Sequence, residues 1–149
     1  MLGGLKLALW NFSFYIINEK NEKLIGINEE ELLSWKNITI DSKSMKKLVQ
    51  VFAEHESLGG IIRLGSEEKT NIEFLFENNC LLEIQANIDL RNMTIEELNC
   101  ILDFMNSNDA VIFCYGRIYR SDRNELTKLL KGSNAYRFCE NPIKFFQNK

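Results

Sequence analysis

The most regular pattern of apolar and polar positions lies in residues 72–88. Apolar residues occupy every second position there, first up to Phe76 and again from Cys80 onward. Because successive side chains of a strand point to opposite faces, this pattern predicts a β-hairpin with one apolar face. We expect a three-residue loop over 77–79 that pairs Phe76 with Cys80 and holds Asn79 in the left-handed conformation. The opposite, solvated face carries Glu73, Glu83, Gln85 and Asn87.

A second apolar segment, residues 5–17, alternates with a change of phase. Since the side-chain period of a strand is two, the change predicts a bulge or bend near Leu9-Trp10, or two short strands. Further strands are expected over 38–40, 61–64 and 135–139. Residues 110–115 are continuously apolar, which is typical of a strand covered on both faces. The chain therefore has enough strand segments for a sheet.

Helix-capping signals predict where the helices begin. Side chains that can accept hydrogen bonds from free backbone N–H groups precede four helical patterns, at Asn28, Asp41, Thr94 and Asp122. Glutamates three residues after Asn28, Thr94 and Asp122 strengthen these starts. The first helix is expected to end near Lys36, and the second is expected to run to about Glu56. The fold class is α+β, with a mostly antiparallel sheet and about four helices packed on it as a single pair of layers.

Composition adds the domain organisation and the compartment. The chain has 149 residues and one proline, with no linker-like stretch, so we expect a single α+β domain over residues 1–149. Four cysteines occur without a C-x-x-C pair, which predicts free, reduced thiols and a cytoplasmic location. The N-terminal apolar run is too short to span the ~20 residues of a bilayer and lacks the features of a signal peptide. Abundant Ile, Asn, Lys and Phe have AU-rich codons and suggest a bacterial source.

Catalytic candidates are few, because His55 is the only histidine. It stands between Glu54 and Glu56 at the expected end of a helix, where consecutive side chains do not converge. Neither carboxylate could orient the ring for general-base chemistry. We therefore predict no catalytic residue, metal or cofactor, and expect the thiol of Cys114 to be inert in its apolar setting. An enzyme that uses a long-range pair of carboxylates or a bound cofactor remains an alternative.

Charge is distributed unevenly along the chain. Residues 1–109 carry 10 Lys and Arg against 18 Asp and Glu, whereas residues 110–149 carry 8 against 3. The two sets can interleave as surface ion pairs, or they can form a bipolar surface that steers a charged partner.

The leading hypothesis is a small acidic module that binds another protein without crossing a membrane. Its most concrete version is an immunity-type or antitoxin-type inhibitor that covers the active site of a basic toxin or nuclease. Acidic residues without an obvious basic neighbour on the same helix are the predicted partner-binding residues: Glu29, Glu30, Glu54, Glu56, Glu67 and Glu68.

The alternative binding hypothesis is an RNA- or single-stranded-DNA-binding module in the basic C-terminal third. Phe113, Tyr115, Arg117 and Tyr119 would share one face if residues 113–119 formed a single strand. Aromatic rings can stack on bases while arginines neutralise phosphates. The candidate nucleic-acid-binding residues are Arg117, Tyr119, Arg120 and Arg123. The isoelectric point near 5.3 and the missing RRM and KH motifs oppose this reading.

Overall fold

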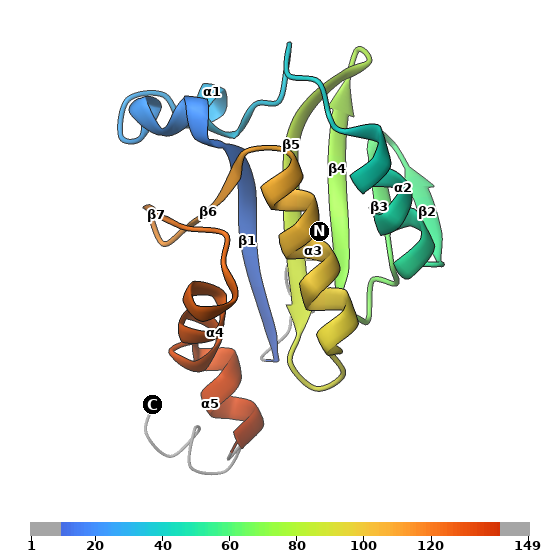
Figure 1. The fold of residues 1–149 in the computed structure, drawn as a ribbon, viewed down its shortest axis with the longest axis vertical. Coiled ribbons are helices and arrows are strands. Elements are labelled where there is room, and N and C mark those ends of the chain that lie inside the picture. The colour runs from blue at the N-terminus through green and yellow to red at the C-terminus, as the bar shows by residue number, and fades with distance from the viewer. Residues whose placement is uncertain (1–9, 141–149) are drawn as a thin grey trace.

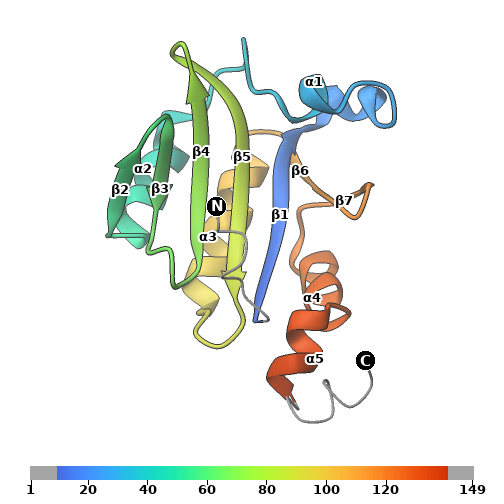
Figure 2. The same ribbon diagram turned by 180° about the vertical axis from the view of Figure 1, so that it is seen from behind.

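The computed structural model describes residues 10–140, which form one seven-stranded sheet in the order β2-β3-β4-β5-β1-β6-β7 (Figures 1 and 2). All neighbouring strands are antiparallel. The strands are β1 (Asn11–Asn18), β2 (His55–Leu58), β3 (Ile61–Leu64), β4 (Asn71–Glu77), β5 (Cys80–Asp89), β6 (Ala110–Cys114) and β7 (Arg117–Tyr119). The phase change predicted near Leu9-Trp10 falls at the edge of the described residues, with Leu9 and the residues before it outside them.

Six helices, including one 3₁₀ helix, accompany the sheet, so the α+β class is confirmed and the expected number of four helices is too low. They are the 3₁₀ helix η2 (Glu19–Leu24), α1 (Glu29–Leu33), α2 (Ser42–Val51), α3 (Ile95–Ser107), α4 (Arg123–Lys131) and α5 (Asn134–Glu140). No helix among residues 10–140 has both the length and the apolar character needed to cross a membrane.

The four predicted helix starts are confirmed. In each, the capping side chain accepts a hydrogen bond of 2.8–3.1 Å from the backbone N–H three residues further on, which satisfies a donor that the helix itself leaves free. The capping residues are Asn28, Asp41, Thr94 and Asp122. At α3 the bond is reciprocal, because the Thr94 backbone N–H donates to the Glu97 carboxylate.

Three predicted segments are wrong. The second helix ends at Val51 rather than near Glu56, because Gly59 and Gly60 have positive φ and make a two-residue turn that folds β2 onto β3. Residues 38–40 are not a strand; their isoleucines pack on the core from a connecting segment. Residues 135–139 lie in α5, where the Ser133 hydroxyl accepts from the Tyr136 backbone N–H at 3.1 Å and caps the helix.

The predicted hairpin exists as β4 and β5, with a different turn. Its loop contains only Asn78 and Asn79, both at positive φ, so Phe76 pairs with Leu81 rather than with Cys80. An irregularity between residues 75 and 76 shifts the register by one and restores the expected parity along the rest of the hairpin. The apolar side chains at positions 72, 74, 76, 84, 86 and 88 consequently share the core face, as the alternation predicts. Beyond the irregularity, Leu81 packs on the core in place of Cys80 and Leu82, which were expected there.

Helices α2 and α3 cover one face of the sheet, in front of it in Figure 1 and behind it in Figure 2. The core between them contains Phe14 and Ile16 of β1, Leu48 of α2 and Ile101 of α3. The buried Trp35 closes this core, and its indole N–H donates to the Ile16 carbonyl at 2.8 Å.

The opposite face of the sheet is covered only in part. Leu32 and Leu33 of α1 pack on Ile17, Val111 and Phe113, so β6 is buried on both faces as predicted. Among the described residues, no helix lies over the same face of β2, β3, β4 and β5 (Figure 2). We call the uncovered side of these strands, together with the adjoining part of β1, the open face.

Candidate protein-binding face

The open face is built from cross-strand rows of side chains. Strand pairing places seven residues in one row that crosses the whole sheet: Glu56, Arg63, Glu73, Gln85, Tyr15, Phe113 and Ile118. The charged and polar members lie on the open part, and the two apolar members lie at the end next to α1. Directly opposed side chains of antiparallel strands are 4.5–5.5 Å apart at Cβ, close enough to interact.

Arg63 organises the part of this row near β2. Its Nε and Nη2 lie 2.9 and 2.8 Å from the same Glu73 carboxylate oxygen, and its Nη1 donates to Glu56. Partial burial alone would lower the pKa of the guanidinium, but these bonds to Glu73 and Glu56 raise it. The three side chains of β2, β3 and β4 are therefore held in one arrangement.

Amide side chains continue the network toward β1. Asn87 Nδ2 donates to Asn71 at 2.8 Å and to Glu73 at 3.3 Å. The side-chain oxygen Oδ1 of Asn87 accepts from the Ser13 hydroxyl at 2.6 Å and from Gln85 Nε2 at 3.1 Å. A hydrogen-bonded network thus extends from β2 to β1, which preorganises the polar groups of the open face.

An acidic corner adjoins α1. The pKa of Glu83 is raised by partial burial and by the nearby carboxylate of Glu29. The pKa of Tyr15 is raised by burial and by both of these carboxylates. Glu56 and Glu73 add two further carboxylates along this side of the sheet, against the one guanidinium of Arg63. The face is therefore suited to a cationic surface.

The structure divides the six predicted partner-binding residues between two corners. Glu29 and Glu30 lie on α1, over the β1–β6 part of the sheet (Figure 2). Glu54 precedes β2, and its carbonyl accepts from the Gly65 N–H, next to the β3–β4 loop that carries Glu67 and Glu68. Only Glu29 and Glu56 belong to the charged groups of the open face.

The prediction missed the other members of this face. The sequence pattern places Glu73 and Glu83 on a solvated strand face and Arg63 in a strand, but the contacts among these residues depend on the register between strands. Alternation within residues 72–88 was the available signal for the acidic pair. No local signal in the sequence connects Arg63 with Glu56 and Glu73.

Residues 113–119 do not form the single strand on which the shared aromatic and basic face would depend. Tyr115 and Gly116 have positive φ and form the turn between β6 and β7. Tyr119 consequently packs on the main core, whereas Phe113 lies on the opposite side of the sheet. Arg117 is exposed on β7, whereas the Tyr119 side chain on the same strand is partly buried against the core. The four candidate residues do not form one nucleic-acid-stacking platform.

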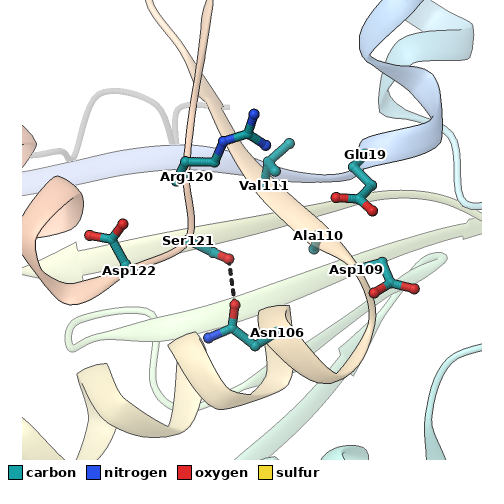
Figure 3. A pocket seen from close by; sticks show the side chains of 8 residues that line it. All are labelled: Glu19, Asn106, Asp109, Ala110, Val111, Arg120, Ser121 and Asp122. Atoms are coloured by element: carbon teal, nitrogen blue, oxygen red, sulfur yellow. Dashed lines mark hydrogen bonds between the residues drawn. The ribbon is translucent and has the colours of Figure 1, made fainter.

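Each of the remaining two arginines has a polar neighbour. Arg120 lies 3.7 Å from Glu22, and Arg123 donates to Asn99. A hollow of about 360 Å³ beside Arg120 is lined by the residues that Figure 3 labels, with three carboxylates among them. Ser121 donates to Asn106 on its wall at 2.8 Å. Carboxylates at this density repel phosphate, so the region is poorly suited to nucleic acid.

Groups for catalysis are poorly placed. His55 is exposed on β2, not at a helix end, and its Nε2 is 3.5 Å from the Val49 carbonyl. All four cysteines are free thiols, and burial raises the pKa of Cys100 and of Cys114 to about 11, as expected of inert thiols. Among residues 10–140, no group of three or more His, Cys, Asp or Glu side chains could hold a metal ion.

Comparison with known proteins gives no relative: no family model, curated protein or solved structure matches the chain. The inference of function therefore depends on the open face.

Proposed function

We propose that this protein is a binding module whose open face docks on a basic surface of another protein. The observation that carries the proposal is the hydrogen-bonded network from β2 to β1, on a sheet face that no described helix covers and on which carboxylates outnumber basic groups. Side chains held in place before binding lose little conformational freedom on association, and complementary charge accelerates encounter.

The proposed partner is an enzyme that binds an anionic substrate, such as a toxic nuclease. Such an active site presents Lys and Arg side chains for phosphate. The carboxylates of Glu29, Glu83 and Glu56 would form ion pairs with these Lys and Arg side chains in place of the phosphate. In this version the protein is an immunity-type or antitoxin-type inhibitor, and a basic toxin is its target.

Glu83 supports a binding role more than a structural one. Burial and the carboxylate of Glu29 disfavour its ionised form, so the charged group adds nothing to the stability of the isolated fold. A Lys or Arg from a partner would relieve both effects. Residues that destabilise a fold are commonly found at binding sites.

The test begins with affinity capture from the source cells, followed by purification of the captured protein and titration by biolayer interferometry. Two variants are compared with the native protein: Glu83→Lys, on the open face, and Asp103→Lys, exposed on α3 on the covered side of the sheet. Both make the same change in net charge. We expect Glu83→Lys to weaken binding at least tenfold and Asp103→Lys to change it by less than about threefold.

Inhibition is measured in the same series by adding the protein to the captured partner's own reaction. Equal loss of binding in both variants would show that only total charge matters. Full binding by Glu83→Lys would show that the open face is not the interface. Reversal at Glu67 and Glu68 tests whether the β3–β4 loop extends the contact.

A further inference from the structure

The two edges of the sheet differ in exposure and in length. β2 forms one edge, with all four of its residues exposed, and among the described residues it pairs only with β3. β7 forms the other edge; it has three residues, and its Tyr119 and Ile118 pack on the two apolar clusters. An additional strand would therefore meet fewer obstacles at β2.

The hydrogen-bond pattern shows which groups of β2 face outward. The Gly65 N–H donates to the Glu54 carbonyl at 2.7 Å. Because bonding alternates along an antiparallel pair, Glu56 and Leu58 also bond to β3, and the backbone N–H and C=O groups of His55 and Ser57 point away from the sheet. Both of these residues therefore present paired donors and acceptors to solvent.

β2 lacks the features that protect exposed edges. Natural sheets commonly block such edges with lysine, proline, a bulge or an unpaired charge. None of these occurs in His55–Leu58, where the one carboxylate is held by Arg63. The side chain of Leu58 lies on the open face and is 71% exposed. An edge of this kind is a template for another strand.

We propose that the β2 strands of two copies of this chain pair antiparallel about a two-fold axis at Ser57. Residues that face each other across an antiparallel pair have their side chains on the same side of the sheet. A two-fold axis between two β2 strands must therefore lie at a residue, where that residue faces its own copy, and few residues of β2 are available. An axis at Glu56 or at His55 would place carboxylates directly opposite each other, a destabilising arrangement.

The axis at Ser57 avoids that repulsion. Ser57 then faces Ser57 of the second copy, and Glu56 faces Leu58 of the second copy on the open side. The partly apolar Glu56–Arg63 pair would cover the exposed leucine. This register therefore brings no like charges together and covers an exposed apolar side chain, which favours a second copy as the occupant.

Such a dimer has one continuous sheet of fourteen strands, twice the seven of a single chain. Because the axis is perpendicular to the sheet, both open faces lie on the same side. The contact is short, and interfaces well below about 1,000 Å² are typically weak. We expect a concentration-dependent dimer.

Sedimentation equilibrium tests the proposal over about 10 µM to about 1 mM protein, the range for weak interfaces. The native chain should shift from monomer toward dimer. Ser57→Pro removes an outward N–H without removing a bond to β3, so it should remain monomeric at every concentration. Ser57→Ala, which keeps the backbone N–H, should dimerise like the native chain.

A cross-linking variant covers the case in which Ser57→Pro does not fold. A hydrogen-bonded antiparallel pair has a Cα separation of about 5.5 Å, within the range of a disulfide. Under mild oxidation, Ser57→Cys should form a covalent dimer, and Ser42→Cys, exposed at the start of α2, should not. A native chain that stays monomeric at about 1 mM, or equal cross-linking of the two cysteine variants, would overturn the proposal.

Discussion

The two ion pairs of Arg63 should contribute unequally to stability. Glu73 is 25% exposed and accepts two guanidinium N–H groups on one oxygen, whereas Glu56 is 57% exposed and accepts one. The guanidinium itself is only 14% exposed. Water therefore screens the pair with Glu56 more strongly than the pair with Glu73.

The magnitudes follow from these exposures. A pair at the surface is worth about 0.2–1 kcal/mol in double-mutant cycles, which is the range expected for Arg63 and Glu56. A partly buried carboxylate with two charge-assisted hydrogen bonds should couple more strongly, by about 1–2 kcal/mol for Arg63 and Glu73.

Two double-mutant cycles measure the difference, with Arg63→Met combined with Glu73→Gln in one and with Glu56→Gln in the other. Free energies of unfolding come from urea titrations followed by circular dichroism. The variants keep side-chain size, so the coupling energy reports the lost ion pair. Equal couplings, or a larger one for Glu56, would contradict the inference that burial makes the Glu73 pair the stronger of the two.

Four further outcomes are expected. Asn108→Ala should lower the free energy of unfolding by about 2–4 kcal/mol, because the buried side chain makes three hydrogen bonds that join α2 to α3; exposed Asn124→Ala is the control. Glu83→Gln should raise the melting temperature at pH 7, where the carboxylate with the raised pKa is forced to ionise in the fold. The gain should disappear at a pH well below the ordinary carboxyl pKa, where Glu83 is neutral in both states. Thiol titration in denaturant without reductant should count four free cysteines, and fewer would reveal a disulfide. His55→Ala should change stability by less than about 0.5 kcal/mol and leave partner affinity within a few-fold.

Features set by neighbouring residues could be predicted from the sequence. The caps at Asn28 and Thr94 depend on a side chain and an N–H three residues apart, and the apolar parity of β4 and β5 depends on the strand period. The predicted hairpin turn is wrong because two arrangements give the same side-chain parity along most of the hairpin. One is a three-residue loop, and the other is the observed two-residue loop with an irregularity between residues 75 and 76. The pattern of neighbouring residues does not distinguish between these two arrangements of the turn.

Features set by distant residues could not be predicted. The apolar spacing of residues 45–52 is compatible with a helix that continues to Glu56, and only the pairing of β2 with β3 shows that the helix ends at Val51. The contacts of Arg63 likewise require two strand registers at once. The six partner-binding residues predicted from the sequence are all glutamates in the acidic part of the chain, but the fold separates those on α1 from those near β2.

The place of β1 in the sheet has a consequence for folding during synthesis. This strand emerges from the ribosome first among the described strands, yet it lies between β5 and β6, and its Ser13 bonds to a residue 74 positions later. Until β5 and β6 have been made, Phe12, Phe14 and Ile16 have no neighbouring strand to pair with. Contacts over such separations slow folding and prolong exposure of apolar segments. A nascent chain halted before residue 110 would therefore be a substrate for chaperones.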